Sequence, residues 1–88
     1  MYTHIEDATK LTPIVEKAVK ALYGKDMQNI KIVKADRFPL FKEPKVGWLV
    51  LTEFNNDQYE YSVQMDVQMV DGSITRTVQL HREALQSG

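Results

Sequence analysis

The sequence predicts a single small α+β domain, in which one N-terminal helix packs on a curled four-stranded antiparallel meander in the order α-β-β-β-β. Three observations predict this fold class. The 88 residues are 43% apolar and 26% charged, which is typical of a globular domain. Apolar residues recur at helical spacing over residues 11–22, and they alternate with a period of two after residue 30. We therefore expect one domain over residues 1–88, with a loosely ordered segment at residues 1–10.

The predicted helix begins at Thr12-Pro13. The threonine hydroxyl can cap a free amide, and proline suits the first helical position. A stripe of apolar residues at helical spacing is expected to face the sheet: Leu11, Ile14, Val15, Ala18 and Leu22. Gly24 then provides the stop signal that commonly ends a helix.

Four segments predict the strands of the sheet, at about residues 30–35, 46–54, 59–69 and 73–82. The third has the clearest alternation of apolar and polar residues, from Tyr59 to Met69. The second is apolar on both faces around Trp48, which indicates a central position. An antiparallel meander follows from this order of short segments.

Turn residues predict the register of the last three strands. A two-residue turn at Asp71-Gly72 would pair Met65 with Val78 and Val63 with Leu80. A two- or four-residue turn around Asn56 would pair Trp48 with Met65. Both turns bring the apolar faces together, so Trp48 and Met65 are expected in the core beneath the helix.

The opposite face of the sheet is expected to be poor in charge. The predicted register gives it mostly uncharged side chains: Leu49, Leu51, Ser62, Gln64, Gln68, Thr75, Thr77, Gln79 and His81. Exposed sheet faces and edges are normally protected from association by charged residues. We therefore predict that part of this face binds a partner, through Leu49, Leu51, Gln64, Thr77, Gln79 and His81.

A second candidate surface lies in residues 37–44. Pro39 and Pro44 prevent a regular strand or helix there, although Phe38, Leu40 and Phe41 are large and apolar. Two interpretations stay open at this point. These three side chains either fold back to close one end of the core or form an exposed docking surface. They are included among the predicted partner-binding residues.

Residues typical of catalytic or metal sites are few. The chain has no cysteine and two histidines, His4 and His81, so a thiolate metal site is excluded. His81 would be a cross-strand neighbour of Ser62, but a flat sheet face offers no oxyanion hole. Glu53 and Glu60 lie near a solvated turn, and the glycines stand singly. We predict no catalytic, cofactor-binding or metal-binding residues, and therefore no enzyme.

Charge and hydropathy also limit the partners. A net charge of −1 lacks the basic footprint of a dedicated nucleic-acid binder. Basic residues between Lys31 and Lys45 are nevertheless interspersed with Phe38 and Phe41. This combination is typical of sites that bind single-stranded nucleic acid. The first ten residues do not resemble a signal peptide, and the longest apolar run is shorter than a membrane span. A cytoplasmic protein without a membrane span is expected.

Three segments resemble the C-terminal half of the gas vesicle protein O family. They are Gly47-Trp48-Leu49-Val50-Leu51-Thr52-Glu53, Tyr59-Glu60-Tyr61-Ser62-Val63-Gln64-Met65-Asp66 and Asp71-Gly72-Ser73-Ile74. More generally, they are similar to small cystatin-like or PepSY-like domains, in which a helix precedes a curled antiparallel sheet. The resemblance covers about half of the chain. It implies an accessory or assembly protein without catalytic residues.

These observations predict a non-catalytic protein-interaction or assembly module, acting as a homodimer or as a small accessory subunit of a larger complex. The alternative is a small-ligand-binding domain or minor enzyme that uses the concave face of the sheet. A weak nucleic-acid binder is the third possibility.

Overall fold

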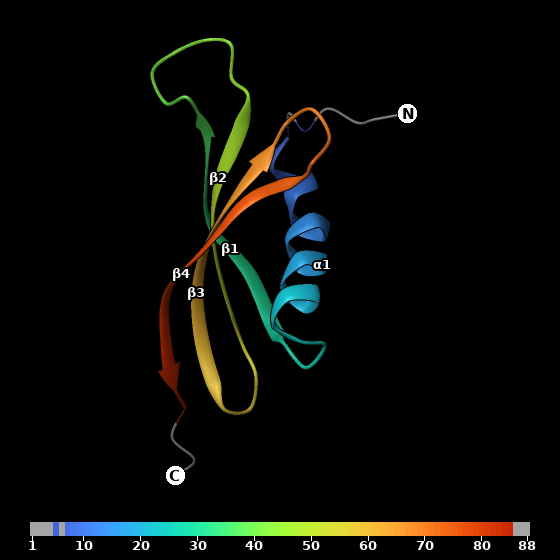
Figure 1. The fold of residues 1–88 in the computed structure, drawn as a ribbon, viewed down its shortest axis with the longest axis vertical. Helices are drawn as coiled ribbons and strands as arrows, with labels where there is room; N and C mark the ends of the chain where they lie inside the picture. The colour runs from blue at the N-terminus through green and yellow to red at the C-terminus, as the bar shows by residue number, and fades with distance from the viewer. Residues whose placement is uncertain (1–4, 6, 86–88) are drawn as a thin grey trace.

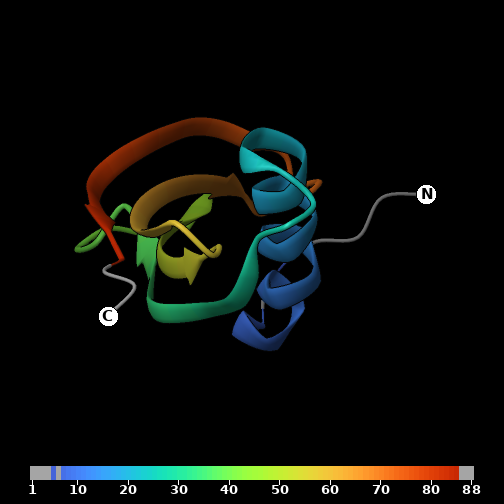
Figure 2. The same cartoon turned by 90° about the horizontal axis from the view of Figure 1, so that it is seen from below.

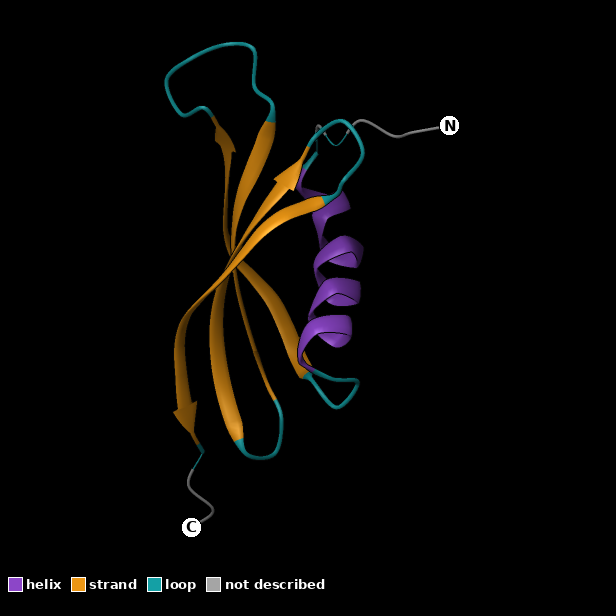
Figure 3. Cartoon of the chain, viewed as in Figure 1, coloured by secondary structure: helices purple, strands orange, loops and turns teal. Residues whose placement is uncertain are grey.

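The computed structural model describes Ile5 and residues 7–85, and it confirms the predicted α+β fold. A 3-10 turn at Ala8–Lys10 leads into helix α1 (Leu11–Tyr23). The strands are β1 (Gln28–Phe38), β2 (Gly47–Asn55), β3 (Tyr59–Gln68) and β4 (Ile74–Ala84), paired antiparallel in the order β1-β2-β3-β4 (Figures 1 and 3). The sheet curls, and α1 lies across the open side of the curl (Figure 2). The core therefore lies between the helix and the concave face.

The helix begins earlier than the sequence predicted. The Asp7 carboxylate accepts a hydrogen bond from the Thr9 amide at 3.0 Å, which caps the 3-10 turn that continues into α1. Thr12 therefore lies inside the helix, and its predicted role as cap is wrong. Pro13 is in the first turn of α1, where no intrahelical partner is lost. The helix ends as predicted at Gly24, where φ is 130°.

The buried face of α1 follows residues spaced four apart. Leu11, Val15 and Val19 are fully buried, and Tyr23 packs against the same core. Such a ridge is inclined to the helix axis, so the face that meets the sheet turns gradually along the helix. This explains why Leu22, predicted to be in the buried stripe, is 59% exposed, whereas the unpredicted Val19 is buried.

The β2–β3 pairing differs from the predicted register by two residues. Trp48 pairs with Val67, and Val50 pairs with Met65. The turn is responsible, because the Asn56 side-chain oxygen accepts hydrogen bonds from the amides of Gln58 and Tyr59. A shift of two residues preserves the face of every side chain. Trp48 and Met65 are accordingly in the core, as expected.

The β3–β4 pairing contains two bulges that the sequence did not indicate. Residues 69–73 connect the strands in place of a two-residue turn, and Thr75 and Leu80 are extra residues on β4. Between these bulges Met65 pairs with Thr77 and Val63 pairs with Gln79. Because paired residues share a face, Thr77 and Gln79 belong to the core side of the sheet. Their predicted place on the opposite face is wrong, since each bulge reverses the alternation.

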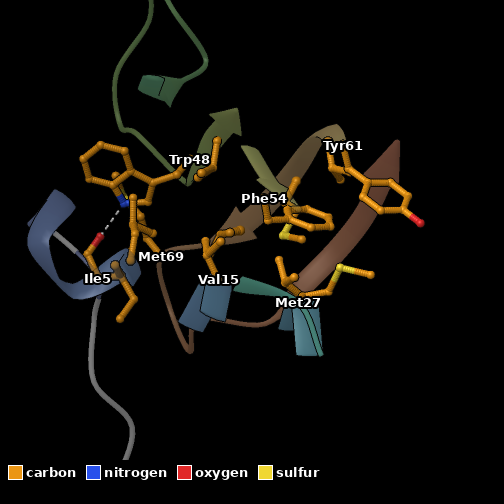
Figure 4. Packing of buried hydrophobic residues seen from close by; sticks show 13 residues of the cluster. Ile5, Val15, Met27, Trp48, Phe54, Tyr61 and Met69 are labelled. Carbon is orange, nitrogen blue, oxygen red and sulfur yellow. Dashed lines mark hydrogen bonds between the residues drawn. The ribbon is translucent and has the colours of Figure 1, made fainter. Parts of the chain in front are cut away.

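Trp48 anchors the start of the described chain. Its indole Nε1–H donates a hydrogen bond of 2.8 Å to the carbonyl oxygen of Ile5 (Figure 4). The Ile5 amide donates in turn to the Met69 carbonyl. Ile5 is 5% exposed and belongs to the core. Of the segment 1–10 that we expected to be loosely ordered, the structure therefore places Ile5 in the core and residues 8–10 in a 3-10 turn. Residues 1–4 and 6 lie outside the described residues.

Aromatic residues fill another part of the core, around the C-terminal end of α1. Phe54 is 1% exposed, and its ring centroid lies 5.1 Å from that of Tyr23 and 5.2 Å from that of Tyr61. Burial raises the pKa of Tyr23, and the nearby Tyr61 adds to this effect. The packing joins β2, β3 and the helix, so these rings tie together elements distant in sequence.

Candidate protein-interaction surfaces

The loop between β1 and β2 divides the apolar residues that the sequence analysis grouped together. The Phe38 ring packs so closely over Gly47 that a Cβ atom there would lie 2.5 Å from Phe38 Cζ. Leu40 is 53% exposed and Phe41 is 97% exposed. Phe38 therefore packs on Gly47, on the face of the sheet opposite Trp48 and outside the core cluster. Leu40 and Phe41 face solvent, so none of the three side chains closes the core. We call Leu40 and Phe41 the tip.

Hydrogen bonds hold the loop in shape at its base. Lys45 Nζ donates to the carbonyl oxygens of Pro39 at 2.6 Å and Leu40 at 3.0 Å. The Val46 amide donates to the Phe38 carbonyl, and the Val46 carbonyl accepts from the Met69 amide. The backbone leading to the tip is thus tied both to its own loop and to the β3–β4 connection. An apolar anchor on a restrained backbone loses less entropy on binding than one on a free loop.

Replacing Lys45 with methionine tests this restraint. The Lys45→Met change keeps most of the aliphatic stem but removes both hydrogen bonds to the loop carbonyls. We expect backbone amides at residues 40–43 to exchange with deuterium several-fold faster, because local opening becomes easier. The free energy of unfolding should change by less than about 1 kcal/mol, because the bonds lie near the surface. Unchanged exchange would show that Lys45 does not restrain the tip.

The sheet face turned away from α1 carries the second predicted surface, which we call the outer face. Leu49, Leu51, Gln64 and Leu80 line a shallow groove of about 300 Å³ there, together with Lys34 and Asp36. The Lys34–Asp36 ion pair is 3.4 Å long, and a Lys31–Glu53 pair of 3.5 Å lies on the same side of the sheet. Exposed pairs of this kind contribute little stability. Their presence nevertheless means that the outer face carries more charge than the sequence suggested.

The bulges change which β4 residues belong to the outer face. Val78 pairs with Gln64, and Leu80 lines the groove, so both contribute apolar surface that the predicted register placed in the core. His81 is opposite Ser62 as predicted, and its Nε2 lies 3.4 Å from Glu83 Oε2 on the exposed surface. Of the predicted residues on this face, the structure brings together Leu49, Leu51 and Gln64, with His81 near the end of the strand.

A third surface was not predicted. Ile14, Lys17, Ala18 and Ala21 of α1 form a groove of about 380 Å³ with Gly72 and Ile74. We call it the α1–β4 groove. Its lining is mostly apolar, with small alanine side chains on the α1 side and Gly72 packed against Ile14. The two alanines and Gly72 are visible in the sequence, but their proximity depends on the β3–β4 connection, which the turn residues alone did not define.

The histidine and acidic side chains of the described residues form no candidate metal site. Within Ile5 and residues 7–85, no group of three or more His, Asp or Glu side chains is placed to hold a metal ion. His4 lies outside this part of the chain. Glu53 and Glu60 are not opposite each other, because Glu53 pairs with Ser62 and Glu60 with Glu83. In the described part of the chain, no helix has the length and apolar character needed to cross a membrane.

Comparison with known proteins does not supply a family for this chain. No protein-family model, curated protein or solved structure matches it. The resemblance to the gas vesicle protein O family stays a prediction from the sequence. The function is therefore inferred from the exposed surfaces of the structure.

Proposed function

We propose that this protein is a non-catalytic protein-interaction module that docks through its tip, either in a homo-oligomer or as a small accessory subunit of a larger complex. The observation that carries the proposal is the 97% exposure of Phe41 on a loop whose base is held by hydrogen bonds. A buried phenylalanine contributes on the order of 150–250 Å² of contact area. Exposing such a side chain gains nothing for the monomer, whereas burying it in a partner stabilises a complex.

The composition of the loop supports a protein as the partner. A central aromatic anchor surrounded by polar groups is typical of binding hot spots. Lys42 and Glu43 follow Phe41 directly and supply one positive and one negative charge for the polar rim of an interface. Small ligands, by contrast, bind where a cavity encloses most of their surface. The tip projects outward and has the shape of a ligand for a pocket rather than of a pocket.

The structure gives nucleic-acid binding less support than the sequence did. Lys31 and Lys34 face carboxylates, Arg37 lies 5.4 Å from the Trp48 ring centroid, and Lys45 is bonded to loop carbonyls. Four of the five basic residues that alternate with aromatics are thus engaged within the chain. A backbone-binding site needs several such cations directed at phosphates.

The Phe41→Ser variant separates docking from folding. Because the side chain is 97% exposed, we expect the free energy of unfolding to stay within about 0.5 kcal/mol of the parent in urea titrations. We expect affinity for the partner to fall at least tenfold, as for truncation of a hot-spot residue. A large loss of stability would place Phe41 in the core and remove the basis of the proposal.

The partner can be found by cross-linking from the tip itself. The photoreactive p-benzoylphenylalanine is introduced in place of Phe41 and, as a control, in place of the exposed Leu80 on the outer face. We expect one saturable protein adduct at position 41 that is absent at the control position. The protein found in the adduct is then purified, and its affinity for the parent is compared with its affinity for Phe41→Ser. Identical adducts at both positions would contradict docking through the tip.

A further inference from the structure

The tip and the α1–β4 groove have complementary chemistry on the same chain. The tip presents Leu40 and Phe41, whereas the groove is lined by two isoleucines, two alanines and a glycine. Phe41 cannot occupy the groove of its own chain, because 97% of its surface is open. Figures 1 and 2 agree that the loop between β1 and β2 stands apart from α1. Any contact between the two features must therefore join different copies.

Small residues give the groove its capacity. Ala18 and Ala21 have short side chains, so the surface of α1 is recessed between Ile14 and the start of β4. Gly72 lines the other side of the groove. Gly72 has a φ of 74°, a conformation that larger residues rarely adopt, so the turn geometry itself favours the absence of a side chain. The groove has a volume of about 380 Å³ and is open to solvent along its length, so it can cover one side of an apolar side chain.

Charges beside the two features are also complementary. Lys42 and Glu43 follow Phe41 at the tip, while Lys17 lines the groove and Asp71 precedes Gly72 at its rim. The Ser73 amide donates a hydrogen bond of 2.8 Å to the Asp71 carboxylate, which lowers the pKa of Asp71. Each feature thus presents one positive and one negative charge next to an apolar centre, which favours a specific orientation.

We infer that the tip of one copy docks into the α1–β4 groove of a second copy, with Phe41 in the groove, Glu43 near Lys17 and Lys42 near Asp71. This inference rests on the proposed function, because it names the occupant of the interface that the tip forms. The contact joins two different surfaces, so each copy uses one tip and offers one groove. Contacts of this heterologous kind build rings or open chains.

The outer face is the competing site for contact between copies. The sheet curls around the core, so this face is convex across the strands (Figure 2). Two convex faces touch over a limited area, and a specific interface needs about 800 Å² from each partner. Leu80 on that face is 54% exposed, so it provides a position at which to test the outer face by substitution.

Sedimentation velocity over a range of concentrations tests the inference with four proteins. The parent should gain mass with concentration, whereas Phe41→Ser, which lacks the tip anchor, and Ala21→Glu, which fills the groove, should each sediment as single chains. Ala21 is exposed on the helix, so a glutamate there is compatible with folding. Leu80→Ser should assemble like the parent. Assembly lost in Leu80→Ser and kept in Phe41→Ser would assign the contact to the outer face and overturn the inference.

Mixing the two monomeric variants gives the decisive result. Phe41→Ser retains an intact groove and Ala21→Glu an intact tip, so an equimolar mixture should form a complex of two chains and no larger species. A mixture that stays monomeric while the parent assembles would overturn the docking of tip into groove. A charge reversal tests the inferred contact between Glu43 and Lys17. The Lys17→Glu change should raise the dissociation constant of self-association several-fold, and adding Glu43→Lys to the same chain should restore it.

The cross-linking at position 41 separates this inference from the proposed function. An adduct between two copies that maps to residues 14–21 or 72–74 supports both. An adduct to a different protein, with a parent that stays monomeric, would retain the docking function and overturn its assignment to a second copy. Absence of any specific adduct at position 41 would overturn both.

Discussion

Replacing Trp48 with alanine is expected to lower the free energy of unfolding by about 3–5 kcal/mol, the usual cost of deleting a large buried aromatic side chain. Trp48 is 4% exposed and belongs to the central core cluster. Its indole nitrogen also holds the carbonyl oxygen of Ile5, so the change would release the N-terminal contact together with the packing. Urea unfolding monitored by circular dichroism measures the loss.

A second substitution at the same position separates these two contributions. Trp48→Phe keeps an aromatic ring but cannot donate the hydrogen bond to Ile5, so we expect a smaller loss of about 1–3 kcal/mol. The Ile5 amide should then exchange faster with deuterium. A loss below about 1 kcal/mol in Trp48→Ala would mean that the indole is not part of the core, and the facing of β2 would have to be reversed.

Replacing Phe54 with alanine should produce a loss of similar size, about 3–5 kcal/mol, in the other part of the core. The ring is 1% exposed and forms a three-ring cluster with Tyr23 of α1 and Tyr61 of β3. Its removal leaves a cavity and ends aromatic contacts that add about 0.5–1.5 kcal/mol for each pair. Because Tyr23 would become more accessible, the burial that raises its pKa would diminish, and spectrophotometric titration should show ionisation at lower pH.

Phe41→Ala is the matched control for Phe54→Ala. It removes the same atoms from a side chain that is 97% exposed rather than 1% exposed. We expect the free energy of unfolding to stay within about 0.5 kcal/mol of the parent. Comparable losses from the two phenylalanine substitutions would contradict the division between the buried aromatic cluster and the tip.

The sequence was sufficient to predict the fold class and most of the core because both depend on side-chain period. Alternation from Tyr59 to Met69 specifies which face of β3 is buried, and a register error of two residues leaves that face unchanged. The helix was predicted for similar reasons, but the position of its buried ridge depends on the angle at which it crosses the sheet. That angle, set by tertiary packing, buried Val19 in preference to Leu22.

The candidate surfaces depend on features with weaker local signals. The predicted two-residue turn placed Val78 and Leu80 on one continuous core face. The extra residues Thr75 and Leu80 instead divide β4 into segments that alternate differently. Nothing in the composition of β4 announces these bulges. For the loop, the sequence shows that apolar residues are present but not which of them packs against Gly47. The close approach over that glycine selected Phe38 and left Phe41 outside.

The irregular pairing also affects what the strand edges can do. β1 and β4 are the edge strands of the sheet, and each is 11 residues long. Each β-bulge places its extra residue on one of these two strands. A regular edge of that length would offer a template to which unfolded or neighbouring chains could add, as in the growth of cross-β fibrils. Bulges interrupt the row of free amides and carbonyls, so an incoming strand would meet a broken template. The same extra residues that changed the face of Thr77 and Gln79 thus help to protect a protein built largely from long strands against fibrillar aggregation.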